Sequence, residues 1–168
     1  MKEELIVGRE APILRTKARL VSTSEVGSAE LAKIIASMKK AVHQEDDGVA
    51  IAAPQIGKSL RIFLVKGGIL KRYPEDAVFI NPDIVRRGRK MHTVEEGCLS
   101  VRWLYGEVLR HERVTLKALS EDGQPITIGA SGLLAQIFQH EVDHLDGILF
   151  IDKAENVRDL PPESHEQG

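Results

Sequence analysis

The sequence SGLLAQIFQHEVDHLDG, residues 131–147, joins a helical pattern to side chains that can bind a metal ion. Its second half contains the pattern H-E-x-x-H, formed by His140, Glu141 and His144. Residues four apart lie on one face of a helix, so both imidazoles can approach one ion. Glu141 is turned about 100° around the helix axis from His140. It can therefore reach a water on the ion without competing as a ligand.

Two histidines leave an ion under-coordinated, so a third ligand must come from elsewhere in the chain. A downstream glutamate has this role in some zinc peptidases, and Glu155, Glu163 and Glu166 are the candidates here. Glu163 has the most suitable spacing, but its segment, PPESHEQG, offers no helix to hold a carboxylate rigidly. The strongest remaining candidate is Cys98. A Cys-His-His set with one open position is typical of a catalytic ion, because structural zinc sites normally use four protein ligands.

The types of ligand leave the choice of metal open. Thiolate and imidazole groups suit Zn(II), Fe(II), Co(II) and Ni(II). Any of these ions would lower the pKa of a bound water from about 16 toward 7. Glu141 could then take and return the proton of that water. The sequence therefore predicts a metal-dependent hydrolase.

An apolar stripe leads into the two histidines. Leu133, Ile137, His140 and His144 are spaced four, three and four residues apart, so they share one face of the predicted helix. Such a stripe is usually plain core. It is also what a catalytic ion beside an apolar side-chain pocket would require.

The rest of the chain predicts an α+β fold. Apolar residues repeat at helical spacing from Ser28 onward, which predicts an N-terminal amphipathic helix that ends near Gly48. At the other end of the chain, Ser131 is a suitable helix N-cap, and Gly147 is suited to the position after the helix. We expect mixed or antiparallel sheets packed around the helix that carries HEVDH. Strands are predicted at LRIFLV, AVFINPDIV, RVTLKAL and PITI, the last two forming a hairpin around Asp122-Gly123.

Composition favours one globular domain. The chain has 168 residues, of which 42% are hydrophobic, and it is long enough to bury its own core. We expect residues 1–152 to form a single catalytic domain and residues 153–168 to form a loose polar tail. The net charge of -2 gives no general attraction to DNA. The basic segment RRGRK, residues 86–90, is either a solvated turn or a docking patch for an acidic partner.

The start of the chain and its apolar runs predict a protein that is not in a membrane. MKEELIVGRE lacks the apolar region of a signal peptide, and no run approaches the roughly 18 apolar residues of a span. The single cysteine cannot form an intrachain disulfide and fits a reducing compartment. We therefore expect the protein to be cytoplasmic.

Three segments together resemble the three motifs of the peptide deformylases. They are GVAIAAPQ (residues 48–55), EGCLS (residues 96–100) and QHEVDHLDG (residues 139–147), and their order and spacing also match. The resemblance implies an enzyme that removes the formyl group from the N-terminal formylmethionine of newly made polypeptides and releases formate. Its partners would be N-formylmethionyl nascent peptides, with no DNA and no membrane.

The resemblance also implies roles for individual residues. Cys98, His140 and His144 would bind the metal, natively Fe(II), with Zn(II), Ni(II) or Co(II) as alternatives. Glu141 would act as general base and then as acid. Gln55 and the backbone N–H of Leu99 would hold the formyl oxygen. Substrate-binding positions implied by the resemblance are Gly48, Val49, Ala50, Val94, Glu96 (through its aliphatic part), Gly97, Leu133 and Ile137.

The chain departs from the family pattern at the first motif and after the second. Ala50 replaces the second glycine of G-x-G-x-A-A, and its Cβ can crowd a substrate strand beside it. Arg102 and Trp103 replace a Pro-Gly pair, and Leu109 replaces the proline of a later V-P-R. Trp103 is either ordinary packing or an extra contact for peptide residues beyond methionine.

Three other interpretations stay open at this level. A zinc peptidase would share the H-E-x-x-H motif but would not use Cys98 as a ligand. A non-enzymatic relative would keep the ion as a structural element. A deformylase for another formylated amine or peptide is the third. Some bacterial deformylases dock on the ribosome through a basic C-terminal helix, whereas the tail here is short and not basic. Any ribosome contact is therefore expected to be transient or to use another surface.

Overall fold

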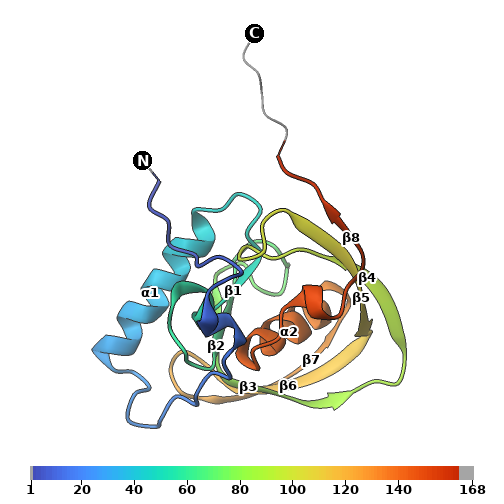
Figure 1. The fold of residues 1–168 in the computed structure, drawn as a ribbon. Helices are drawn as coiled ribbons and strands as arrows, with labels where there is room; N and C mark the ends of the chain where they lie inside the picture. Colours follow the sequence, from blue (N-terminus) through green and yellow to red (C-terminus); the bar gives the residue numbers. More distant parts are fainter. Residues whose placement is uncertain (1, 163–168) are drawn as a thin grey trace.

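Two antiparallel sheets enclose a central helix (Figure 1). The computed structural model describes residues 2–162. One sheet has five strands in the order β1-β2-β3-β6-β7, and the other has three in the order β4-β5-β8. The predicted α+β class with antiparallel sheets is confirmed. The strands are β1 Ala50–Ala52, β2 Ile62–Val65, β3 Ala77–Arg87, β4 Met91–Glu96, β5 Leu104–His111, β6 Arg113–Leu119, β7 Pro125–Ser131 and β8 Glu155–Asp159.

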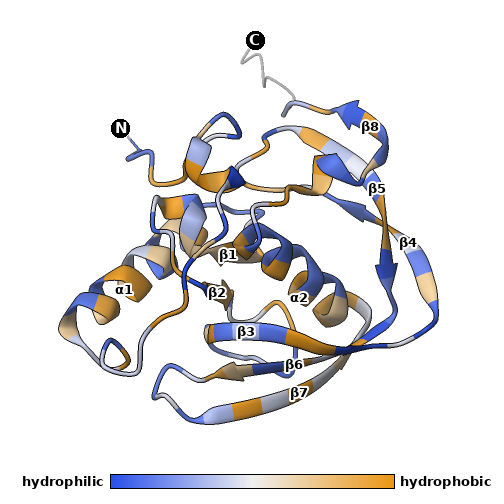
Figure 2. Ribbon diagram, turned by 60° about the horizontal axis from the view of Figure 1, so that its bottom comes forward, coloured by the Kyte–Doolittle hydropathy of each residue, from blue (hydrophilic) through white to orange (hydrophobic). Residues whose placement is uncertain are grey.

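Helix α1, Ala29–His43, covers one face of the five-stranded sheet. The Ser28 side chain caps it by accepting a hydrogen bond of 3.1 Å from the N–H of Leu31. Its apolar face buries Ile35 and Met38 against strand residues that include Ile62. Figure 2 shows the alternation of hydrophobic and hydrophilic segments along both helices. The short 3-10 helices are η1 Pro12–Arg15, η2 Ala53–Ile56 and η3 Phe150–Asp152.

Helix α2, Gly132–Leu145, lies on the opposite face of the same sheet. All four residues of β2 are buried because this strand is covered on both sides. Ile62 packs with α1, whereas Phe63 packs with α2, as the two-residue period of a strand requires. The ring of Phe63 stacks on Phe79 at 4.8 Å, and Phe79 meets Phe138 of α2 edge-on at 5.3 Å. This aromatic cluster anchors the helix that carries both histidines.

The ends of α2 match the expected positions only in part. Ser131 occupies the N-cap position, but its side chain makes no capping hydrogen bond. Gly147 follows the helix with a φ of 76°, a conformation that glycine adopts without strain. A Cβ at Gly147 would also lie 2.8 Å from the carbonyl oxygen of Arg15. The glycine therefore permits both the turn and the close approach of the N-terminal segment.

The expectation of a loose tail after residue 152 was wrong for Glu155–Asp159. These residues form β8, which pairs with β5 through Leu104↔Asp159 and Tyr105↔Arg158. All five side chains are exposed, so backbone pairing rather than side-chain burial fixes this strand. Such a strand leaves no apolar pattern in the sequence. Two candidate ligands, Glu163 and Glu166, lie outside the described residues.

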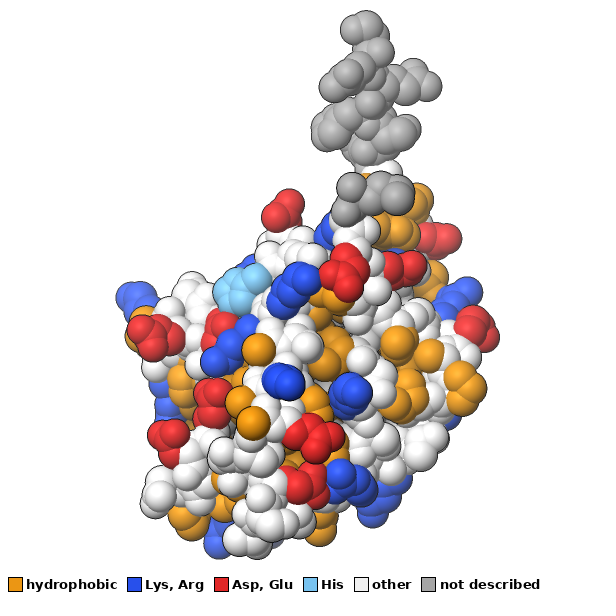
Figure 3. Space-filling view, turned by 90° about the vertical axis from the view of Figure 1, so that its left-hand side faces the viewer, with side chains coloured by type: hydrophobic (Ala, Val, Ile, Leu, Met, Phe, Trp, Pro, Cys, Tyr) orange, Lys and Arg blue, Asp and Glu red, His pale blue; other side chains and the backbone are white. Residues whose placement is uncertain are grey.

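The surface carries charges of both signs. On the face that carries α1, acidic and basic side chains are interspersed (Figure 3). The basic segment at residues 86–90 begins in the exposed end of β3, and its role as a docking patch stays a prediction. Within residues 2–162, neither helix has the length and apolar character needed to cross a bilayer.

Candidate active site

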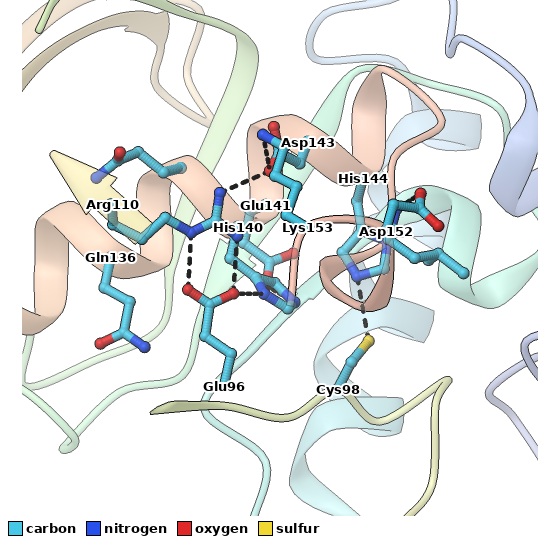
Figure 4. A network of polar contacts seen from close by, with 12 residues as sticks. Glu96, Cys98, Arg110, Gln136, His140, Glu141, Asp143, His144, Asp152 and Lys153 are labelled. Carbon is cyan, nitrogen blue, oxygen red and sulfur yellow. Dashed lines mark hydrogen bonds and ion pairs between the residues drawn. The ribbon is translucent and has the colours of Figure 1, made fainter. Parts of the chain in front are cut away.

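Cys98, His140 and His144 converge on one point between α2 and the end of β4. One ligand atom from each lies within 4.8 Å of the other two. The Cys98 Sγ is 3.2 Å from Nε2 of His144 (Figure 4). The two imidazole rings come from successive turns of α2 and are 5.0 Å apart. The structure thus brings together the three residues that the sequence singled out as metal ligands.

A buried network of ion pairs contacts this cluster through Nδ1 of His140. Glu96 Oε1 lies 2.8 Å from Nδ1 of His140, and Arg110 donates to both oxygens of Glu96 at 2.7 and 2.8 Å. Arg110 also donates to Asp143 at 2.7 Å, and Lys153 reaches the same oxygen of Asp143 at 3.0 Å. The side chains of Arg110 and Glu96 are each 3% exposed. A carboxylate on Nδ1 holds the ring so that Nε2 faces the ligand cluster.

The network keeps Glu96 ionised. Burial alone would raise the pKa of Glu96, but hydrogen bonds from Arg110 and His140 lower it to about 2. In turn, burial would lower the pKa of His140, whereas its hydrogen bonds to Cys98 and Glu96 raise it well above the ordinary value. Burial would likewise raise the pKa of the Cys98 thiol, but the electrostatic interaction with His144 and hydrogen bonds to both histidines lower it well below the usual range. A depressed thiol pKa favours the thiolate, which is the form that binds metals.

Glu141 is buried beside the cluster, and one of its oxygens has no partner. The residue is 4% exposed, and Oε2 makes no hydrogen bond with the described residues. Its other oxygen lies 3.9 Å from Nε2 of His140. Burial raises the pKa of this carboxyl above its ordinary value. A buried carboxylate oxygen without a partner, next to a Cys-His-His donor set, fits a site that holds an ion and its water.

Gln55 has a fixed orientation at the cluster. Its Oε1 accepts a hydrogen bond of 2.9 Å from the N–H of Ala52, which directs the amide NH₂ the other way. That NH₂ lies 3.2 Å from Oγ of Ser100 and 3.6 Å from Sγ of Cys98. Gln55 is 1% exposed, so this donor cannot swing away into solvent.

A cavity of about 320 Å³ opens onto the cluster. Its volume lies within the range of small-molecule sites, about 300 to 1,000 Å³. Among the sequence-predicted positions, its lining includes Val49, Ala50, Gln55, Glu96, Gly97, Cys98, Leu99, Leu133, Ile137, His140 and Glu141. The lining also includes residues that the sequence did not single out: Asp47, Glu95, Val101, Leu104, Tyr105 and Gln136. Gln136 precedes His140 by four residues, so helix phase was a usable signal for it.

Two expected substrate-binding residues lie outside the cavity lining. Gly48 is buried, and a Cβ there would come within 2.7 Å of the carbonyl oxygen of Val42. A glycine here lets the chain pass close to the end of α1, and the expected substrate contact of Gly48 stays a prediction. Val94 pairs with Val108 between β4 and β5, and its neighbour Glu95 lines the cavity instead.

Comparison with known proteins shows to which family the chain belongs. A model of the polypeptide deformylases matches residues 4–159. The chain belongs to this family. The resemblance inferred from the three motifs is thereby confirmed, and the alternative of an unrelated zinc peptidase is not supported. As a peptide deformylase, the protein removes the N-formyl group from nascent peptides.

Relatives resemble this deformylase over most of its length. The peptide deformylase of Halothermothrix orenii is 44% identical over 142 residues, which are 84% of this chain and 87% of the relative. That of Natranaerobius thermophilus is 41% identical over 148 residues, covering 87% and 88% of the two chains.

Solved structures share the fold. A class I type b peptide deformylase from Acinetobacter baumannii, crystallised with Met-Ala-Ser bound, superposes with a TM-score of 0.81 at 37% identity and covers 88% of this chain and 96% of that one. A peptide deformylase from Legionella pneumophila gives a TM-score of 0.80 at 39% identity and covers 90% and 85%.

Proposed function

We propose that Glu141, beside an ion held by Cys98, His140 and His144, hydrolyses the formyl amide of N-formylmethionyl peptides. The observation that carries this proposal is the buried Oε2 of Glu141. It has no hydrogen-bond partner among the described residues, although Glu141 lies beside the convergent ligand atoms of Cys98, His140 and His144. A divalent ion at this position would lower the pKa of a bound water and polarise the formyl carbonyl. Fe(II) is the native metal in this proposal, and Zn(II), Ni(II) or Co(II) would fit the same donors.

Glu141 moves the proton. Its carboxylate takes a proton from the attacking water and later delivers it to the nitrogen of the departing amine. Burial raises the pKa of Glu141, which brings the carboxyl closer to neutral pH and suits a group that must both accept and release a proton. Oε1 lies 3.9 Å from Nε2 of His140, and Oε2, which has no hydrogen-bond partner among the described residues, is available to the attacking water.

Gln55 and the backbone N–H of Leu99 stabilise the charge that develops on the formyl oxygen. Attack on an amide carbonyl produces a tetrahedral oxyanion, and donors fixed in advance toward that oxygen lower the barrier. The contact of Gln55 with Ala52 fixes its NH₂ on the side of Cys98. Leu99 lines the same cavity directly after the cysteine.

The apolar part of the cavity receives the methionine side chain. Val49 comes from the segment before β1, and Leu133 and Ile137 come from α2. Strand β1 is at the edge of its sheet, so its backbone can pair with an extended peptide. Ala50 begins this strand and lines the cavity, which makes it the residue that a substrate backbone would pass.

The setting of the reaction is also part of the proposal. Newly made polypeptides are the substrates, so we place the enzyme in the cytoplasm, in transient contact with ribosomes at most. A single catalytic domain suffices, because the ligands, the base and the cavity all lie between residues 47 and 144.

Formate release tests the proposal. Protein prepared without oxygen and loaded with Fe(II) or Ni(II) is mixed with formyl-Met-Ala-Ser, and acetyl-Met-Ala-Ser serves as the matched control. We expect formate from the first peptide and no acetate from the second, because a methyl group must enter the space that the formyl hydrogen occupies. Folded, metal-loaded protein that releases no formate, or that cleaves internal peptide bonds instead, would contradict the proposal.

A further inference from the structure

Trp103 and Arg102 form a stacked pair at the catalytic cavity. The guanidinium carbon of Arg102 lies 4.6 Å from the centroid of the Trp103 ring system. Both residues line the cavity that also contains His140 and Glu141. Cation–π contact of this kind orients an indole ring as well as stabilising it. The pair occupies the two positions at which this chain lacks the Pro-Gly of the motif.

Two carboxylates from another loop hold Arg102 in place. Its Nη1 is 2.7 Å from Asp47, and its Nη2 is 2.6 Å from Glu45. These acidic residues belong to the loop between α1 and β1, whereas Arg102 belongs to the loop between β4 and β5. Burial would lower the pKa of Arg102, but its bonds to Asp47 and Glu45 raise it. The ion pairs therefore connect the two loops. They also fix the position of the Arg102 guanidinium, which supports the indole ring of Trp103.

Trp103 is not part of the protein core. Among the described residues, three clusters of buried apolar side chains account for the core, and Trp103 belongs to none of them. The next residue, Leu104, packs against the third cluster. The Trp103 backbone is anchored by a hydrogen bond of 2.9 Å from the N–H of Leu160 to its carbonyl. Its half-buried indole is thus held at the cavity wall without being needed for packing.

The charges at this wall are already paired, so it offers an aromatic surface. Arg102 is neutralised by its two carboxylates, and Glu45 also pairs with Lys2 at 2.8 Å. Arg102 is the only lysine or arginine among the described residues that line the cavity, so an acidic peptide side chain would find no unpaired cation from them. An aromatic or large apolar side chain could pack against the indole, with aromatic pairs giving an advantage of about twofold to tenfold.

We propose that Trp103, held by Arg102, is a specificity-determining residue that contacts the side chain following formylmethionine and favours an aromatic residue there. This inference rests on the proposed function, because it places the peptide in the same cavity. The methionine side chain uses the wall of α2, and the next residue of the peptide extends toward the loop between β4 and β5.

The test compares two formylated peptides in the metal-loaded enzyme. For the intact protein, we expect kcat/KM for formyl-Met-Phe-Ser to exceed that for formyl-Met-Ala-Ser by about fivefold. Trp103→Ala should reduce this ratio to about one, mainly through a higher KM for the phenylalanine peptide. Arg102→Ala should reduce it in part, because the indole loses its support. Trp103→Leu provides a second variant that keeps an apolar side chain if the alanine variant folds poorly.

The control variant is Leu109→Ala on β5. Leu109 is also a large apolar side chain, 57% exposed, but it lies outside the cavity lining. The ratio of kcat/KM for the phenylalanine peptide to kcat/KM for the alanine peptide should be the same in Leu109→Ala as in the intact protein. This inference would be overturned if the intact protein did not prefer phenylalanine after formylmethionine, or if Trp103→Ala kept that preference. Either result would leave the deformylase activity unaffected. Failure of the intact protein to release formate from either peptide would overturn the proposed function and this inference together.

Discussion

Arg110 donates two parallel hydrogen bonds to Glu96, from Nε at 2.8 Å and from Nη2 at 2.7 Å. The pair is almost fully buried. Oε1 of Glu96, which accepts the hydrogen bond from Nη2, also lies 2.8 Å from Nδ1 of His140. A carboxylate so placed fixes the tautomer of a ligand histidine. The motif glutamate therefore acts on the ligand ring as well as lining the cavity.

Removing Arg110 should destabilise the whole protein. Arg110→Ala would leave the Glu96 carboxylate buried without its main partner, which costs about 3 to 5 kcal/mol in the free energy of unfolding. Urea unfolding measures this change. Arg113→Ala is a suitable control, because Arg113 is an exposed arginine on β6, the next strand along the chain. If Arg110→Ala lowers the free energy of unfolding no more than Arg113→Ala does, the buried pair does not hold the site together.

Weakening the hold on His140 should weaken metal binding. Glu96→Gln removes the negative charge that accepts from Nδ1, and losses of about tenfold to a hundredfold in metal affinity are typical of such changes. Competition with a chelator of known affinity measures the effect. Glu95→Gln is the matched control, since its carboxylate is more than half exposed and pairs with Arg158 rather than a ligand. Equal affinities in the two variants would argue against a role for Glu96 in orienting the ring.

Gln55 should affect turnover more than binding. Gln55→Ala removes a fixed donor from the formyl oxygen, and kcat should fall by about a hundredfold to a thousandfold while KM changes little. Steady-state formate release measures both constants. Gln136→Ala, which truncates a second glutamine of the same cavity on α2, should leave kcat within a few-fold of the intact value. A change confined to KM in Gln55→Ala would place this residue in ground-state binding instead.

Oxygen should inactivate the native enzyme if its metal is Fe(II). Cys98 belongs to the Cys-His-His set that would hold the ion, and both Fe(II) and the thiolate would be open to oxidation. Specific activity after anaerobic purification should exceed that after aerobic purification, and protein loaded with Ni(II) before any exposure to oxygen should show a much smaller difference. Equal activities after both purifications of the native enzyme would point to Zn(II) or another ion that does not change oxidation state.

Some of this site was readable in the sequence because its geometry is local. The spacing of His140, Glu141 and His144 on one helix fixes their relative directions, and Leu133 and Ile137 follow from the same helix phase. The buried strands β2, β3 and β6 carry branched apolar residues that mark them. Cys98 was found by excluding other ligands and by the match of three motifs, not by geometry.

The remainder depends on contacts between distant segments. Arg110 and Asp143 are 33 positions apart, and nothing in either local sequence shows that they pair. Strands β4 and β5 mix charged and apolar residues, because one of their faces is solvent-exposed, and so they lack a continuous apolar run. The packing of Gly48 against the end of α1, where a Cβ would lie 2.7 Å from the carbonyl oxygen of Val42, also depends on such a contact. Its role in substrate binding stays a prediction.

Glu141 is proposed to act as the general base, and a comparison of the intact protein with Glu141→Gln tests this role. Formate release from formyl-Met-Ala-Ser is measured for the intact protein and for Glu141→Gln, with both proteins carrying the same amount of metal. The substitution keeps the size of the side chain but removes its ability to accept a proton. We predict that turnover falls by at least about a hundredfold in Glu141→Gln. Similar turnover in the two proteins would contradict the assignment of Glu141 as the general base.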